Sequence, residues 1–161
     1  MLTVTLWMAG VGAMDGDKPF FLKESPADRV FNRLFGFLVR FGIGASYNYL
    51  LETRGRKSGR TYATPVNLLE MNGHRYLVAV RGETGWVRNA RAAGSVRLRK
   101  GSNQLDFKVR EVAVEDRAPM LKEFLERYAS QVQRFYPVPK GSPLDAFREM
   151  ASRAPVFELM N

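Results

Sequence analysis

Five short runs of β-forming residues between residues 46 and 112 constrain the fold more than any other feature of the chain. They are rich in β-branched and aromatic residues, and turn chemistry separates them at residues 56–59, 72–73 and 101–102. The runs are SYNYLLETR (46–54), TYATPVNLLEM (61–71), RYLVAVR (75–81), SVRLRKG (95–101) and QLDFKVREV (104–112). Strands spaced this closely predict an antiparallel barrel or sheet.

Helical patterns interrupt and follow these strands. The stretch TGWVRNARAAG (84–94) predicts a short helix that Gly94 closes. Residues 115–132 place apolar side chains at spacings of three and four, which predicts an amphipathic helix. After the helix-breaking FYPVPKGSP, a third short helix is expected over LDAFREMASR (144–153), and a last strand over APVFELM (154–160). The order indicates an α+β barrel with flanking helices.

A further helix is expected to begin near the N-terminus. Ser25 is a capping residue, Pro26 suits the first helical position, and Asp28 follows three residues after the cap. The expected helix has a wide apolar face formed by Val30, Phe31, Leu34, Phe35, Leu38 and Phe41. Two interpretations stay open: the face packs on the domain, or it lies on a membrane with arginines directed toward lipid phosphates.

The segment before this helix, residues 1–24, is treated as a leader, and residues 25–161 as one domain. The leader begins with the apolar stretch MLTVTLWMAGVGAM, which is too short to span a bilayer and lacks the basic start of a secretory signal. A disordered leader, a peripheral membrane contact and a first element tucked against the domain are the interpretations that remain.

The net charge, the absence of cysteine and the single histidine limit the partners and the kinds of catalytic chemistry that we expect. The chain has 25 Lys and Arg against 16 Asp and Glu, a formal net charge of +9, which favours an anionic partner or a solvated positive face. The absence of cysteine excludes disulfides and thiolate chemistry and fits a cytoplasmic location. The single histidine, His74, follows an Asn-Gly turn and is expected to be exposed, so we expect neither a Ser-His-Asp triad nor a metal site.

Residues 52–65, ETRGRKSGRTYATP, crowd four cations around two glycines. Glycines let backbone N–H groups approach a ligand, and cationic side chains supply charge-assisted hydrogen bonds, so such a turn can hold phosphate or carboxylate. A solvated hairpin tip is the alternative. The spacing matches neither a Walker loop nor a dinucleotide fingerprint. The candidate ligands are Arg54, Arg56, Lys57 and Ser58.

The motif TRGRKSGRTYATPV, followed by RYLVAVRGETGWVRNARAAGSVRLRKG, resembles the deazaflavin-dependent nitroreductase and quinone-reductase family of actinobacteria. The similarity covers residues 48–113, and RAPVFELM is similar to the family's closing strand. The resemblance implies a split β-barrel of the flavin-reductase type. It also implies an oxidoreductase that uses coenzyme F-420, whose phospholactyl and polyglutamate tail is strongly anionic.

The resemblance also assigns roles to residues of this chain. The residues that match the family's tail-binding loop are Arg54, Arg56, Lys57, Ser58 and Arg60. Thr64 and Pro65 begin the strand under the deazaflavin. The segment beside the ring and phosphate is Ala79, Val80, Arg81 and Gly82. Trp86 and Asn89 match the aromatic residue and the asparagine of the short helix, with core packing as the alternative for Trp86.

The chemistry that the resemblance implies is hydride transfer from the reduced coenzyme to a quinone, an enone or a nitroaromatic compound. Tyr128 and Tyr136 are the candidate proton donors, with packing as the alternative role for each. The chain departs from the nitroreductase pattern in ETGWVRN, which lacks His-Pro and has Val87 in place of tyrosine, and at Val80, where those enzymes have serine. These departures concern the acceptor, so reduction of nitroimidazoles is not expected to follow.

Other functions fit parts of the pattern. Split barrels of similar shape bind FMN or haem, and a single turn histidine argues against haem. A basic barrel that binds nucleic acid would need exposed aromatics, but Tyr47, Tyr49 and Tyr62 lie on strands that look like core, so no nucleic acid is expected. A peripheral membrane reductase would reach lipid-soluble quinones through residues 1–41. A homodimer is typical of the fold, although no self-complementary patch is evident.

Overall fold

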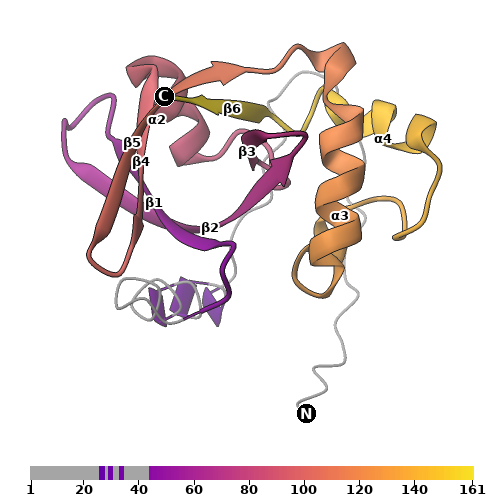
Figure 1. The fold of residues 1–161 in the computed structure, drawn as a ribbon, viewed down its shortest axis with the longest axis horizontal. Coiled ribbons are helices and arrows are strands. Elements are labelled where there is room, and N and C mark those ends of the chain that lie inside the picture. Colours follow the sequence, from indigo (N-terminus) through magenta and orange to yellow (C-terminus); the bar gives the residue numbers. More distant parts are fainter. Residues whose placement is uncertain (1–25, 28, 31–32, 35–43) are drawn as a thin grey trace.

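The fold is taken from a computed structural model, which describes residues 26–27, 29–30, 33–34 and 44–161. Six strands form a closed antiparallel barrel in the order β1-β2-β3-β6-β5-β4 (Figure 1). The strands are β1 (Asn48–Arg54), β2 (Thr61–Met71), β3 (His74–Val78), β4 (Ser95–Lys100), β5 (Asn103–Glu111) and β6 (Val156–Met160). The expected antiparallel barrel is confirmed.

The hairpin between β2 and β3 forms at Asn72-Gly73, as the sequence predicts. Asn72 has φ of 53° and Gly73 has φ of 79°, so both central residues adopt the left-handed conformation that a tight primed turn requires. His74 follows directly and its side chain is 57% exposed. Its Nδ1 lies 2.6 Å from Glu158 Oε1, and Arg110 donates to the other oxygen of that carboxylate. The expected exposure of His74 is confirmed.

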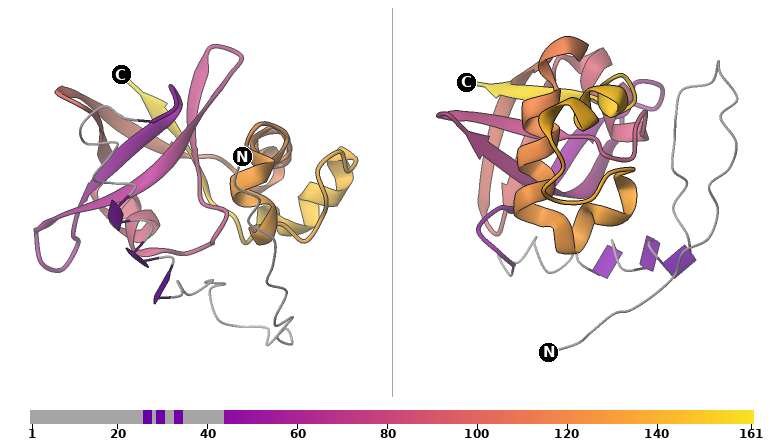
Figure 2. Two further views of the ribbon diagram at one scale, coloured as in Figure 1. Left: turned by 90° about the horizontal axis from the view of Figure 1, so that it is seen from below. Right: turned by 90° about the vertical axis from the view of Figure 1, so that its right-hand side faces the viewer.

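Within residues 44–161, three helices accompany the barrel: α2 (Gly85–Ala93), α3 (Ala118–Val132) and α4 (Leu144–Ala151). Two short 3-10 turns, η1 (Val114–Asp116) and η2 (Gln133–Phe135), flank α3. Helices α3 and α4 pack together as a layer beside the barrel, whereas α2 lies against the barrel itself (Figure 1 and Figure 2). The flanking helices therefore occupy two separate positions.

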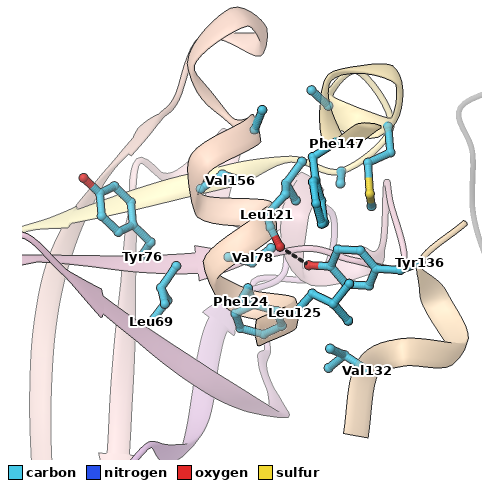
Figure 3. Packing of buried hydrophobic residues seen from close by; sticks show 14 of the residues in the cluster. Leu69, Tyr76, Val78, Leu121, Phe124, Leu125, Val132, Tyr136, Phe147 and Val156 are labelled. Atoms are coloured by element: carbon cyan, nitrogen blue, oxygen red, sulfur yellow. Dashed lines mark hydrogen bonds between the residues drawn. The ribbon is translucent and has the colours of Figure 1, made fainter. Parts of the chain in front are cut away.

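Two hydrophobic cores follow from this arrangement. The first fills the barrel, and α2 contributes Val87 and Ala90 to it, both with no exposed surface. The second lies between the barrel wall and the α3–α4 layer, where Leu121, Leu125 and Phe147 have no exposed surface (Figure 3). Because β2, β3 and β6 contribute side chains to both cores, these strands form the wall that separates them.

A buried arginine joins β5 to the helical layer. Arg117, which precedes α3, is only 5% exposed. Its Nε donates to the Val112 carbonyl at 2.9 Å, its Nη1 to the Ala151 carbonyl at 3.0 Å and its Nη2 to Glu111 at 3.0 Å. The pKa of Glu111 lies below its ordinary value, mainly because Arg91 donates to it, with Arg117 adding to the effect. Arg117 thus connects three segments of the chain.

Of the expected first helix, residues 26–27, 29–30 and 33–34 are described, and they are helical. Two members of its expected apolar face fall among them, Val30 and Leu34, and they are 71% and 61% exposed. Phe31, Phe35, Leu38, Phe41 and the leader lie outside the described residues. No helix in the described part of the chain combines the length and the apolarity needed to cross a bilayer.

Candidate functional site

The cationic turn between β1 and β2 is a compact loop. Gly55 N–H donates to the Arg60 carbonyl at 2.7 Å, and Gly59 N–H donates to the Gly55 carbonyl at 2.8 Å. Gly59 has φ of 68°, a conformation that glycine adopts without steric cost. The hydroxyl oxygens of Ser58 and Tyr62 lie 3.1 Å apart, and Arg60 N–H donates to Ser58 Oγ. The glycines therefore shape the loop and do not leave it loose.

Replacing Gly55 by alanine is expected to lower the free energy of unfolding by about 1–2 kcal/mol, a small overpacking cost. An added Cβ would lie 2.5 Å from the Tyr62 ring, 2.7 Å from Ser58 Oγ and 3.2 Å from the Arg60 carbonyl. The two side chains must therefore swing away and their hydroxyl contact must break. Chemical denaturation measures the loss. Gly85→Ala is the matched control, since its Cβ meets nothing within 4 Å, and equal stability of the two variants would contradict the prediction.

The cations of this loop lack compensating charge. Arg54, Lys57 and Arg60 are exposed, and no carboxylate of the described residues lies within ion-pair distance of them. Several arginines of the barrel and of α2 are paired: Arg91 with Glu83 and Glu111, Arg97 with Asp106, and Arg99 with Glu52. The loop cations lack such partners among the described residues, so their positive charge is available to an anionic ligand.

Arg56 differs from its neighbours because α2 holds it. The side-chain oxygen of Asn89 accepts from the Arg56 backbone N–H at 3.3 Å and from Arg56 Nη1 at 3.2 Å. The Asn89 amide nitrogen lies 3.4 Å from Thr53 Oγ1 on β1. The structure therefore brings Arg56 and Asn89 together, as expected for one site, although Asn89 is buried and directed toward the protein.

Residues 79–84 connect β3 to α2. The sequence predicts a strand as far as Arg81, and this is wrong because β3 ends at Val78. Ala79 N–H donates to the Pro155 carbonyl, but Pro155 has no N–H with which to continue the ladder. The chain then turns through Gly82, which has φ of 79°. Ala79 points into the barrel core, Val80 packs on the second core, and the Arg81 guanidinium lies 5.8 Å from the centre of the Phe135 ring.

A buried hydroxyl lies at the N-terminus of α2. Thr84 occupies the N-cap position and is 9% exposed, yet its side-chain oxygen makes no capping bond. Within the described residues it has no hydrogen-bond partner at all. Buried hydroxyls are usually satisfied, and a helix N-terminus favours acceptor oxygens of an anion. Together with the uncompensated loop cations, this hydroxyl fits a polar, negatively charged cofactor such as a phosphorylated deazaflavin.

The remaining candidate binding residues line strands and the helix start. Thr64 and Pro65 are half-buried on β2, opposite Leu51 and Leu50 of β1. Trp86 is half-buried, and its ring centroid lies 5.8 Å from that of Phe157 in the barrel core. This contact supports the packing interpretation of Trp86 and does not contradict the ligand interpretation. The assignment of Thr64, Pro65 and Trp86 as ligands of the cofactor stays a prediction.

Both candidate proton donors are engaged in the second core. Tyr136 donates to the Leu121 carbonyl at 2.9 Å (Figure 3), and Tyr128 donates to the Leu68 carbonyl at 2.7 Å. Burial raises the pKa of both phenols above the ordinary value of 10.0. A phenol that is buried and already bonded to the main chain favours the packing role, and the catalytic role stays a prediction.

Tyr136→Phe is expected to lower the free energy of unfolding by about 1 kcal/mol, the usual net value of a neutral hydrogen bond. The rate of oxidation of the reduced coenzyme is expected to change less than about twofold, because the phenyl ring keeps its packing on Phe147. Chemical denaturation and a steady-state assay measure the two effects. A fall in kcat of about a hundredfold, typical for loss of a general acid, would instead assign Tyr136 to catalysis.

Two hollows in the surface lie apart from the cationic loop. One, of about 800 Å³, lies between the β2–β3 hairpin, α3 and the C-terminus, and its arginines pair within it, Arg75 with Glu70 and Arg127 with Glu123. The other, of about 550 Å³, is lined by Tyr47, Tyr49 and Tyr128 among others. Among the residues that line these two hollows there is none from the cationic loop, and Thr84 is not among them either.

The sequence did not lead us to assign Thr53, Tyr62 or Thr84 to the candidate site. For Thr84 the sequence contains an indication, since a threonine directly before a helix is a typical N-cap. Thr53 and Tyr62 carried none, because their contacts with Asn89 and Ser58 depend on the register between β1, β2 and α2.

A closed antiparallel barrel with helices packed on its wall defines the split β-barrel class of proteins. Residues 36–138 match the family model described as F-420H(2)-dependent quinone reductase, which covers more than half of the 161 residues. The chain belongs to this family. It is therefore an oxidoreductase, and coenzyme F-420 is its cofactor.

Two solved structures with a TM-score of 0.50 have the same fold. A structure described as a domain-swapped dimer is 24% identical with a TM-score of 0.50, over 84% of this chain and 99% of that chain. A protein of unknown function from Agrobacterium tumefaciens is 17% identical with a TM-score of 0.50, over 89% and 58% of the two chains. An F-420-H2 dependent reductase is 26% identical with a TM-score of 0.47, over 71% and 94%. No protein of curated function matched the sequence.

Proposed function

We propose that this reductase binds coenzyme F-420 along the β1–β2 loop and the start of α2, and that a quinone, an enone or a nitroaromatic compound accepts its hydride. The observation that carries the proposal is the set of exposed loop cations without a carboxylate partner among the described residues. The tail of the coenzyme is strongly anionic, and charge-assisted bonds from arginine and lysine would hold it.

The chain's own residues would bind, orient and shield the coenzyme. The proposed tail ligands are Arg54, Arg56, Lys57, Ser58 and Arg60. The proposed neighbours of the ring and phosphate are Thr64, Pro65, Ala79, Val80, Arg81, Gly82 and Trp86, with Thr84 added for its buried hydroxyl. When bound, the reduced coenzyme supplies the hydride, and the protein contributes orientation and exclusion of water.

A quinone is the first acceptor to test, because the name of the family specifies one. Contact of the N-terminal segment with a membrane, and so access to lipid-soluble quinones, is supported by the exposure of Val30 and Leu34. A cytoplasmic location and a homodimer complete the proposal, the latter on the likeness to a structure described as a domain-swapped dimer.

The test is a fluorescence titration of the purified protein with oxidised coenzyme F-420, beside FMN and a short single-stranded oligonucleotide. We expect saturable quenching by coenzyme F-420 alone. Binding of FMN or the oligonucleotide without binding of coenzyme F-420 would overturn the proposal and require the loop to be assigned to another anion.

The acceptor is tested separately by following oxidation of the reduced coenzyme under anaerobic conditions. A benzoquinone, a cyclic enone and a nitroarene are supplied in turn, each with an enzyme-free control. Turnover with at least one of them is expected. Binding of the coenzyme without turnover of any would retain the cofactor site and overturn the proposed acceptor class.

A further inference from the structure

Asn89 uses its side chain to hold the loop. It is only 6% exposed, and its position on α2 directs it at β1 and the loop that follows. Its oxygen accepts two bonds from Arg56, one from the backbone and one from the guanidinium, which occupies both of its lone pairs. Its nitrogen lies 3.4 Å from Thr53 Oγ1, a long contact. The amide oxygen is therefore saturated by the protein before any ligand arrives.

We propose that Asn89 is a positioning residue that holds Arg56 and the loop in the conformation that receives the anionic tail, and not a ligand of the coenzyme. The inference rests on the proposed function, and it gives Asn89 a different role from the one that the family resemblance implies. Four cations within seven residues repel one another, so an unsupported loop would spread them apart. A neutral acceptor on a rigid helix counters this tendency without cancelling the positive charge that the ligand needs.

A second contact, made by Tyr62 of β2, also restrains the loop. Tyr62 is 50% exposed, its hydroxyl lies 3.1 Å from Ser58 Oγ, and its ring borders Gly55 at a distance that leaves no room for a Cβ. Asn89 and Tyr62 thus hold one loop through different elements, α2 and β2. Fixing a loop before binding reduces the entropy lost on binding, so both contacts are expected to strengthen affinity for the tail alone.

The experiment compares two ligands: intact coenzyme F-420, and the deazaflavin riboside that lacks the phospholactyl-glutamyl tail. For Asn89→Ala we expect about tenfold weaker binding of the intact coenzyme, and less than about twofold change for the tail-less ligand. The dependence of Kd on salt concentration is also expected to become shallower, because the loop cations no longer act together. Asn103→Ala is the matched control, since it removes the same amide from the exposed start of β5, and unchanged affinity is expected.

Each outcome decides the matter. If Asn89→Ala weakens the binding of both ligands equally, Asn89 contacts the body of the coenzyme and the inference is wrong. If it weakens the binding of neither, Asn89 does not contribute to binding and the inference is also wrong. Asn89→Ser, which stays polar but is too short to reach Arg56, replaces the alanine variant if thermal melting shows that the latter does not fold. Failure of the wild-type chain to bind intact coenzyme overturns the proposed function first, and this inference with it.

Discussion

Replacing Arg117 by alanine is expected to lower the free energy of unfolding by about 3–5 kcal/mol, the range observed when one partner of a buried charged network is removed. The guanidinium is 5% exposed and donates to Val112, Ala151 and Glu111. Its loss leaves two buried main-chain carbonyls short of a donor and removes the link between β5 and α4. Chemical denaturation measures the change.

The control for this prediction is Arg97→Ala. Arg97 forms an ion pair with Asp106 at 2.7 Å, but both side chains are largely exposed, and exposed pairs contribute about 0–1 kcal/mol. The two variants remove the same side chain from positions that differ in burial. A loss below about 1 kcal/mol for Arg117→Ala would show that water replaces its bonds and that the two cores are joined in another way.

Replacing Arg54 and Lys57 together by alanine is expected to weaken binding of coenzyme F-420 by about a hundredfold. Each charge-assisted bond contributes about 1.5–3 kcal/mol when buried, and the lower end applies to an exposed loop, so each cation accounts for about tenfold. Stability is expected to change by less than about 0.5 kcal/mol, because neither residue has an ion-pair partner among the described residues. Fluorescence titration and denaturation measure the two quantities.

The control for the loop variant removes the same charge from the other side of the molecule. Lys140→Ala combined with Arg148→Ala takes two cations from the α3–α4 layer, where Lys140 and Arg148 are exposed. Affinity is expected to stay within about twofold, because charges beyond a Debye length are screened at physiological salt. Equal weakening by both double variants would show that the coenzyme responds to net charge and would contradict a specific loop site.

The sequence predicted the strands closely because turns and alternation are local signals. The run expected over residues 61–71 is β2 with the same bounds, and Asn72-Gly73 forms the expected hairpin. The run expected over residues 75–81 was too long by three residues, since its end depends on β6. Pro155 interrupts the ladder there, and no pattern within residues 75–81 reveals a partner about 75 positions away.

The site was predicted as a set of charges and not as a set of contacts. Exposure of Arg54, Lys57 and Arg60 follows from their position in a polar turn, and the structure agrees. The bonds of Asn89 join residues from different elements, and the unsatisfied hydroxyl of Thr84 depends on what surrounds it. Both features therefore became visible only with the fold. The phenol of Tyr128 shows the same limit, because helical spacing identifies a buried face but not the carbonyl to which the hydroxyl donates.

The closure of the barrel between β1 and β4 has a consequence for how copies of this chain can meet. Every strand in the described residues has a neighbour on both sides, but the pairing is staggered: residues 61–67 of β2 pair with β1 and not with β3, and residues 103–107 of β5 pair with β4 and not with β6. An open sheet edge is the usual template for strand addition and for the growth of fibrils. Addition of a strand to the described fold is therefore expected at these two edges, whereas β3 and β6 are paired on both sides and are protected until the barrel opens.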